Sequence, residues 1–376
     1  MRVMIIAGEA SGDQHSARLV RSVHALDPSV EFFGIGGECM RKAGVDIRVD
    51  SADMAVVGLV EIWAHRKVIF GALNKMRDIL KTDPPDLLFL TDYPEFNLRL
   101  AKTAKQAGVK VLFYISPQIW AWRQWRVKKI RSLVDMMAVI FPFELDFYHR
   151  HHVPVRFVGH PLADEVHASA GREALCAEFG LDSERPVVGL FPGSRQSEVK
   201  RLMPIIVETA KQLKQHKPDI QFLLPVASTL QPDIFNAYMD SETPPIKMLE
   251  NRSYDVMAAC DAIVTVSGTV TLEIALIGTP MVIINRISAL SYFIAKQMVN
   301  VDHIGLCNIV AGKRIVTELI QYDAKAEKIS AEIMKILTQD AYRQSIRNEL
   351  QKVRTRLSSE GDVTDLATLT IELLKK

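Results

Sequence analysis

The sequence predicts an α/β protein of two domains, each built on a parallel sheet that helices cover. Three observations support this fold class. The chain has 376 residues, which is too long for one ordinary core. Short apolar runs alternate with amphipathic segments along the chain. Segments such as Leu87–Leu90 are apolar at every position, as expected of strands that are buried on both faces.

Six strands are predicted in the first half of the chain and four in the second. The first six are Arg2–Ala7, Glu31–Ile35, Asp86–Thr91, Val109–Ile115, Met136–Phe141 and Val155–Val158. The other four are Pro186–Phe191, Gln221–Pro225, Ala262–Val266 and Met281–Asn285. The restart of the pattern places the domain boundary near residue 165, which gives domains at 1–165 and 166–349. The tail, about 350–376, is expected to be helical. It can pack back on the first domain or exchange with a second copy in a homodimer, and the pattern favours neither.

Composition and charge exclude several classes of protein. The net charge of +2 gives no reason to expect a nucleic-acid partner. The four cysteines form no CxxC pair, which favours free thiols in a reducing compartment. The first apolar segment indicates a strand rather than a secretory signal. No apolar run approaches the roughly 20 residues of a membrane span. We therefore expect a protein that does not cross a membrane but can lie on one.

One loop of the second domain has the composition of a phosphate site. Ser267, Gly268 and Thr269 follow the strand Ala262–Val266 and precede a predicted helix. Backbone N–H groups at such a helix start suit a phosphate or diphosphate. Glu273 lies about one turn further on, where a carboxylate can accept hydrogen bonds from ribose hydroxyls. The alternative is an ordinary helix cap.

A second loop of the same kind follows the first strand of this domain. Gly193 allows a close approach of the backbone, Ser194 is small, and Arg195 can neutralise a diphosphate through charge-assisted hydrogen bonds. The alternative is a surface turn with a solvated arginine. Two such loops at the ends of two strands of one sheet favour the phosphate site.

The first domain offers carboxylates instead. Glu9 and Asp13 lie in the loop after the first strand, and Asp92 follows the strand Asp86–Thr91. The first of these loops fits neither a P-loop nor the GxGxxG fingerprint. Carboxylates at the carboxyl ends of strands suit acid–base chemistry or the binding of sugar hydroxyls. Helix capping and a structural turn are the alternatives.

All four tryptophans fall in two basic segments. One segment is Leu59–Arg77, with Trp63, Val68 and Ile69, and the other is Trp120–Arg131, with Trp120, Trp122, Arg123 and Trp125. Tryptophan beside Lys and Arg is typical of a surface that lies in a bilayer interface. Two amphipathic core helices with solvated basic faces are the alternative.

No metal and no cofactor are predicted. The histidines of the tract His149–His152 are interleaved with arginine and have no carboxylate among them, which favours a solvated segment. The chain also lacks a DxD pair of the kind that holds a divalent ion in many sugar transferases.

These motifs, in this order, resemble the lipid-A-disaccharide synthase family along essentially the whole chain. The resemblance is carried by Ala7–Asp13, Thr91–Asn97, Tyr114–Arg123, Val158–Leu162, Pro192–Arg195, Ser267–Glu273 and the segment around Asn308. It departs at Cys307, where relatives usually have a proline directly before the asparagine.

The resemblance implies a glycosyltransferase of the GT-B type, with two Rossmann-like doubly wound domains facing a central cleft. The donor would be UDP-2,3-diacylglucosamine and the acceptor 2,3-diacylglucosamine 1-phosphate, joined by a β-1′,6 link. Asp92 is the expected base on the acceptor's 6-hydroxyl, with Glu9 and Asp13 as rivals. Arg195 and the helix start at Ser267–Thr269 would stabilise the departing UDP, and Glu273 and Asn308 would hold the ribose or sugar.

Lipid tails on both substrates would explain the two basic segments. The resemblance implies a cytoplasmic protein that associates peripherally with the inner membrane through Leu59–Arg77. The segment Trp120–Arg131 would serve the membrane or the acceptor's phosphate. Two other functions stay open at this point: a different GT-B enzyme such as a UDP-sugar epimerase, and a non-catalytic protein that binds a nucleotide sugar or a lipid.

Overall fold

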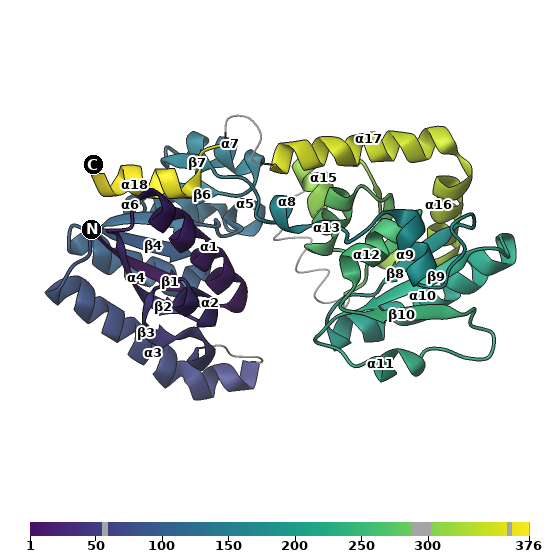
Figure 1. Ribbon diagram of the computed structural model, residues 1–376, viewed down its shortest axis with the longest axis horizontal. Helices are drawn as coiled ribbons and strands as arrows, with labels where there is room; N and C mark the ends of the chain where they lie inside the picture. Colours follow the sequence, from purple (N-terminus) through teal and green to yellow (C-terminus); the bar gives the residue numbers. More distant parts are fainter. Residues whose placement is uncertain (55–58, 288–301, 359–362, 376) are drawn as a thin grey trace. The chain divides into compact units, whose positions relative to one another are not determined.

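The computed structural model describes residues 1–54, 59–287, 302–358 and 363–375, and the side chains of residues 59–66 are outside that description. The chain forms two compact units, one of Met1–Pro161 with Ser359–Lys376 and the other of Leu162–Ser358. Each unit is a parallel sheet between layers of helices (Figure 1). The predicted α/β class with two parallel sheets is confirmed. None of the described helices combines the length and the apolar character that a membrane span requires.

Unit 1 contains a seven-stranded sheet in the order β3-β2-β1-β4-β5-β6-β7. The strands are β1 (Arg2–Ala7), β2 (Glu31–Gly36), β3 (Asp46–Asp50), β4 (Leu87–Thr91), β5 (Lys110–Tyr114), β6 (Met136–Val139) and β7 (Val155–Phe157). β1 and β4 are neighbours at the centre, with Ile5 opposite Phe89. The strand order reverses between them, and ligands bind at such a switch point, beyond the carboxyl ends of the strands.

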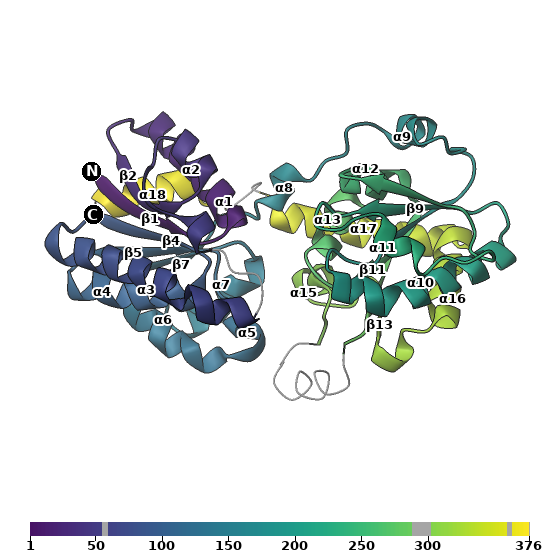
Figure 2. The ribbon, with the colours of Figure 1, turned by 90° about the horizontal axis from the view of Figure 1, so that it is seen from below.

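Helices cover both faces of this sheet, as Figure 2 shows. On one face lie α1 (Ala10–Leu26), α2 (Glu38–Lys42) and α18 (Leu366–Lys375), and on the other α3 (Leu59–Thr82), α4 (Pro94–Gln106) and α6 (Val127–Leu133). The shorter elements are η1 (Ser51–Asp53), α5 (Ile119–Trp122), η2 (Gln124–Arg126) and α7 (Pro142–Arg150). α18 packs on α1 of the same chain, and Lys110 Nζ donates to the carbonyl of Leu373 at 3.1 Å.

Unit 2 contains a six-stranded sheet in the order β10-β9-β8-β11-β12-β13. The strands are β8 (Val187–Phe191), β9 (Gln221–Val226), β10 (Ile246–Glu250), β11 (Ala262–Val266), β12 (Met281–Asn285) and β13 (Thr317–Ile320). β8 pairs with β11, with Phe191 opposite Thr265. The order reverses between these two strands, so unit 2 has its own switch point.

The helices of unit 2 also form two layers (Figure 2). α12 (Ser253–Ala259) and α13 (Val270–Ile277) cover one face, and α10 (Gln196–His216) and α16 (Ala326–Thr338) cover the other. The remaining elements are α8 (Leu162–Glu165), α9 (Arg172–Glu178), α11 (Asp233–Asn236), α15 (Leu306–Ala311), η3 (Gln321–Asp323) and α17 (Asp340–Leu357). α17 packs on α13 and α15, so the two long tail helices belong to different units.

All ten predicted strands are present, with ends that agree to within two residues. Three further strands, β3, β10 and β13, were not predicted. The chain passes between the units at Pro161–Leu162 and again at Ser358–Ser359.

Candidate functional site

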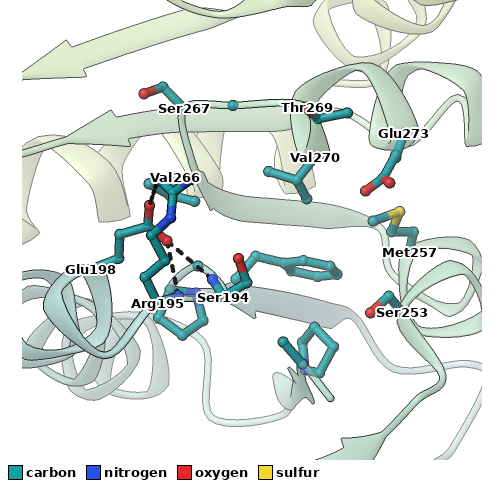
Figure 3. A pocket seen from close by; sticks show the side chains of 16 residues that line it. Ser194, Arg195, Glu198, Ser253, Met257, Val266, Ser267, Thr269, Val270 and Glu273 are labelled. Carbon is teal, nitrogen blue, oxygen red and sulfur yellow. Dashed lines mark hydrogen bonds and ion pairs between the residues drawn. The ribbon is translucent and has the colours of Figure 1, made fainter. Parts of the chain in front are cut away.

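Seven predicted residues line one pocket at the switch point of unit 2. Because β8 and β11 are parallel neighbours, the loops that follow them emerge at the same edge of the sheet. A cavity of about 410 Å³ lies between the two loops (Figure 3). Among its lining residues are Gly193, Ser194, Arg195, Ser267, Gly268, Thr269 and Glu273. The sheet order therefore joins two loops that are more than 70 residues apart in the sequence.

The loop after β11 borders this pocket at the start of α13. The side chain of Asn285, at the end of β12, donates to Ser267 Oγ at 2.6 Å. Thr271 Oγ1 donates to the carbonyl of Gly268 at 2.8 Å. None of the hydrogen bonds recorded for the described residues uses the amides of Gly268 or Val270, which stand at the start of α13. These N–H groups, with the positive end of the helix dipole, suit an anion.

The loop after β8 is held by a residue that was not predicted. Glu198, in the first turn of α10, accepts hydrogen bonds from the amides of Ser194 and Arg195 at 3.1 and 3.2 Å. Because these amides already have an acceptor, the group that the loop offers to a ligand is the guanidinium of Arg195. Its side chain is 79% exposed.

Glu273 lies between this pocket and a second cavity. The second cavity, of about 470 Å³, shares Ala227, Ser253 and Glu273 with the first. The hydroxyl of Tyr254 donates to Glu273 Oε1 at 3.5 Å. Burial raises the pKa of the Glu273 carboxyl, and the hydrogen bond from Tyr254 opposes that shift. Glu273 is thus a half-buried acceptor that both cavities can reach.

Asn308, which is expected to hold the ribose or sugar, is not among the residues that line either cavity. Its side chain is fully buried. Nδ2 donates to the carbonyl of Val316 and to Glu318 Oε1, and Oδ1 accepts from the amides of Ile315 and Val316. All four hydrogen-bonding positions of the amide are used inside unit 2, so the side chain is committed to the fold. Cys307 is the second residue of α15, where a proline also fits because no intrahelical acceptor is needed.

In unit 1, Asp92 stands at the switch point in a strained backbone conformation. Asp92 and Tyr93 both have left-handed backbones, with φ of 45° and 44°. Asn97 Nδ2 holds this turn by donating to the carbonyl of Asp92 at 2.6 Å and to that of Thr91 at 3.2 Å. Such strain persists where the surroundings enforce it, and it clusters at functional sites.

The carboxyl of Asp92 is electrostatically perturbed. Burial raises its pKa, and the negative charge of Glu9 raises it further. Glu9 comes from the loop after β1, which is the neighbour of β4, and its side chain is exposed. Gly8, just before it, leaves room for the Tyr93 ring, because a Cβ there would lie 2.6 Å from Tyr93 Cδ1. The two loops of the unit 1 switch point therefore pack together.

Asp13, the third predicted carboxylate, is buried and hydrogen-bonded to backbone amides of unit 1. Its side chain is 5% exposed and accepts hydrogen bonds from the amides of Gly37, Cys39 and Met40 at 2.7, 2.9 and 3.1 Å. These amides belong to the N-terminal turn of α2, so Asp13 ties α1 to α2. The lone pairs of this carboxylate are thus engaged within unit 1.

The tryptophan-rich segments separate into core and surface. Trp120 is only 8% exposed and packs edge-on against Phe143. It therefore lies in the core of unit 1, whereas we expected it on a surface for the membrane or the acceptor. Trp122 is 43% exposed and Trp125 is 73% exposed. The side chain of Trp63 lies outside the described residues.

The exposed residues of both segments meet on one face of unit 1. Val68 and Phe70 of α3 are exposed, while Ile69 is half-buried. The guanidinium of Arg99, on α4, lies 5.8 Å from the Phe70 ring.

One turn before Arg99 on α4, Glu95 continues this face. Its carboxylate binds Arg126 at 2.7 Å and lies 4.0 Å from Arg123. The Arg123 guanidinium in turn stacks over the Trp122 ring at 3.9 Å. These contacts link α3, α4 and the segment 122–126. We call their exposed part the aromatic–basic surface; it consists of Val68, Phe70, Glu95, Arg99, Trp122, Arg123 and Trp125, and the 12% exposed side chain of Arg126 supports it.

Three residues that shape these sites were missed from the sequence. Glu198 follows Arg195 by three residues, which is the spacing of a capping box and was a usable signal. Asn97 lies within the segment Thr91–Asn97, but its contact with the turn depends on the left-handed backbone. Tyr254 gave no signal, because it is 19 residues away from Glu273.

Comparison with known proteins agrees with this arrangement. A family model described as lipid-A-disaccharide synthetase matches residues 3–367. The lipid-A-disaccharide synthase of Trichlorobacter lovleyi is 56% identical over 375 residues, which cover 100% of this chain and 98% of the relative.

Solved structures with low sequence identity share the fold. The kitacinnamycin glycotransferase has a TM-score of 0.63 at 14% identity, with 99% of this chain and 98% of that chain covered. A UDP-GlcNAc 2-epimerase from Neisseria meningitidis, bound to UDP-GlcNAc, has a TM-score of 0.61 at 13% identity, with 100% of each chain covered. The predicted GT-B fold class and the predicted family are confirmed: this chain belongs to the lipid-A-disaccharide synthase family.

Proposed function

We propose that unit 2 binds the UDP part of the sugar donor and that Asp92 of unit 1 activates the acceptor. As a member of its family the chain is a glycosyltransferase of lipid A biosynthesis. The reaction transfers 2,3-diacylglucosamine from its UDP conjugate to the 6-hydroxyl of 2,3-diacylglucosamine 1-phosphate. The proposal for the donor rests on one observation, the convergence of seven predicted residues on a single pocket. Family membership favours this reaction over the epimerase and binding-protein alternatives.

Two adjoining cavities suit the two parts of UDP. The first cavity, with Arg195 and the amides at the start of α13, suits the diphosphate. Glu273 stands where the cavities join, and it suits the ribose hydroxyls. The same donors stabilise the negative charge that UDP gains as it leaves. The shared fold of an epimerase bound to UDP-GlcNAc supports this assignment.

Asp92 is the carboxylate best suited to be the base. Asp13 is buried under three amide donors, and Glu9 is exposed, whereas Asp92 is half-buried with a raised pKa. In the proposed step, its carboxylate takes the proton of the acceptor's 6-hydroxyl. The hydroxyl oxygen attacks the anomeric carbon from the face opposite to UDP, and the bond to the diphosphate oxygen breaks with its electrons leaving on UDP.

The test is UDP release from UDP-2,3-diacylglucosamine in detergent micelles, with and without 2,3-diacylglucosamine 1-phosphate, in the presence of EDTA. We expect release that depends on the acceptor and is unaffected by EDTA. Bound UDP without release would support the epimerase or the binding-protein alternative, and release without acceptor would show hydrolysis of the donor instead of transfer.

Changing Glu9 to Gln is expected to shift the pH dependence of transfer. The charge of Glu9 raises the pKa of Asp92, so its removal lowers that pKa. A base works when deprotonated, and the acid limb of kcat/KM against pH should therefore move to lower pH. Glu38→Gln, at an exposed carboxylate on α2, is the control and should leave the profile in place. A Glu9→Gln profile that coincides with the wild type would contradict the coupling.

We also propose that the aromatic–basic surface of unit 1 binds the cytoplasmic face of the inner membrane. It combines exposed indoles and apolar side chains with the guanidinium groups of Arg99 and Arg123, which suits a bilayer interface with anionic headgroups. Both substrates carry acyl chains, so an enzyme on the membrane surface can take them from the lipid phase.

Replacing Trp122 and Trp125 by serine should weaken the binding of the full chain to anionic phospholipid vesicles by about tenfold, because two indoles lose their burial in the interface. Cosedimentation measures the bound fraction. Tyr322 is 79% exposed in unit 2, and Tyr322→Ser is the matched control. Equal losses in both variants, or none in the double variant, would place the membrane contact elsewhere.

A further inference from the structure

Glu198 occupies the place in the loop after β8 where an anion is expected. Its Oε2 accepts hydrogen bonds from the amides of Ser194 and Arg195, and its Oε1 pairs with Arg195 Nη1 at 3.3 Å (Figure 3). Two amides and a guanidinium around one carboxylate resemble the way in which a helix N-terminus binds a phosphate.

The loop is shaped around this carboxylate. Gly193 has φ of +108°, which disfavours any side chain there, and a Cβ on it would lie 2.3 Å from Glu198 Oε2. The carboxylate therefore packs directly over the glycine. Its contact with the helix N-terminus also stabilises the first turn of α10. Glu198 thus holds the loop in its phosphate-binding shape before any ligand enters.

The same carboxylate adds an unfavourable charge to the site. Among the described residues that line the cavity, Arg195 is the one cation, and Glu198 and Glu273 are both acidic. Glu198 also engages the Arg195 guanidinium, which the ligand needs. A diphosphate entering the pocket therefore meets a like charge and has to compete for its counter-ion.

The repulsion by Glu198 differs between the UDP-sugar donor and the product UDP. In a UDP-sugar the terminal phosphate is esterified, whereas in free UDP it has a second ionisation, and phosphate monoesters have that pKa near 6. UDP thus carries nearly one more negative charge than the donor at neutral pH. A fixed carboxylate repels it more strongly.

We propose that Glu198 is a positioning residue that preforms the phosphate loop and, through its charge, selects the UDP-sugar donor over the product UDP. The inference rests on the proposed UDP site and adds a means of product release. According to this inference Glu198 lowers the affinity for UDP. A residue that only kept the loop folded would raise that affinity.

The test compares uridine, UMP and UDP binding to the full chain by titration calorimetry, in the wild type and in Glu198→Gln. Glutamine keeps an oxygen for the two amides but loses the charge. We expect UDP to bind about three- to tenfold more tightly to the variant, as for the loss of one partly screened like charge. Affinity for uridine should not change, and the gain in affinity for UMP should lie between those for uridine and UDP. The inhibition constant of UDP should fall more than the KM of the donor.

Three controls separate the explanations. Glu198→Asp keeps the charge and should not tighten UDP binding, while Arg195→Ala should weaken UDP and leave uridine unaffected. If Glu198→Gln does not fold, Glu198→Ser carries the same expectation for the ratio of UDP to uridine affinity. Unchanged or weaker UDP binding by the neutral variants, with uridine still bound, overturns the inference. A wild-type chain that binds neither ligand overturns the proposed site itself.

Discussion

Replacing Asp92 by Asn is expected to lower kcat for transfer by about 10²- to 10⁴-fold, the usual contribution of a general base, and to leave UDP affinity unchanged. Asparagine is isosteric and tolerates the left-handed backbone at this position, where φ is 45°. The fold of the turn should survive, because Asn97 holds it through main-chain carbonyls rather than through the Asp92 side chain. The loss should thus fall on the chemical step.

Two measurements complete this experiment. Single-turnover transfer measures the chemistry, and UDP titration measures the donor site in unit 2. Asp13→Asn is the matched control, because Asp13 accepts three amide hydrogen bonds at α2 and its replacement should lower the melting temperature more than it lowers the rate per folded molecule. If Asp92→Asn weakens UDP binding as much as it slows transfer, Asp92 is a binding residue and Glu9 becomes the candidate base.

The strands that sequence reasoning missed share one physical property. β3, β10 and β13 all lie at sheet edges, and their sequences are DIRVD, IKMLE and TELI. An edge strand is less completely covered than a central one, so it keeps polar side chains and lacks the continuous apolar run that marks β4 or β11. The central strands could be predicted because burial on both faces dictates their composition.

The site residues could likewise be predicted where their local sequence carried the signal. The loops around Arg195 and Ser267 were recognisable, because glycine and hydroxyl residues after a buried strand have a local meaning. That they form one pocket depends on the pairing of β8 with β11, which chain order alone does not specify. The burial of Asp13 and Trp120 could not be predicted, because their partners in α2 and at Phe143 lie at least 23 residues away in the sequence. Composition does not show which way a side chain points.

Asn308 is a position where the resemblance and the structure make different predictions. A residue that holds substrate needs an unused donor or acceptor, and the Asn308 amide has none. Its partner Glu318 is 6% exposed and also accepts from the amides of Ile304 and Gly305. The asparagine is therefore one of three donors that keep a buried carboxylate satisfied between α15 and β13.

Asn308→Ala should accordingly destabilise unit 2 by about 2–4 kcal/mol, because it leaves buried amides, a carbonyl and part of a carboxylate without partners. Denaturant unfolding measures this cost, with UDP titrated at a temperature where the variant stays folded. Asn236, exposed on α11 in the same unit, is the control, and its replacement by Ala should change stability by less than about 0.5 kcal/mol. A stable Asn308→Ala variant that fails to bind UDP would show that this residue binds substrate. An unstable variant with normal UDP affinity would show that Asn308 serves to hold the loop between α15 and β13 in place.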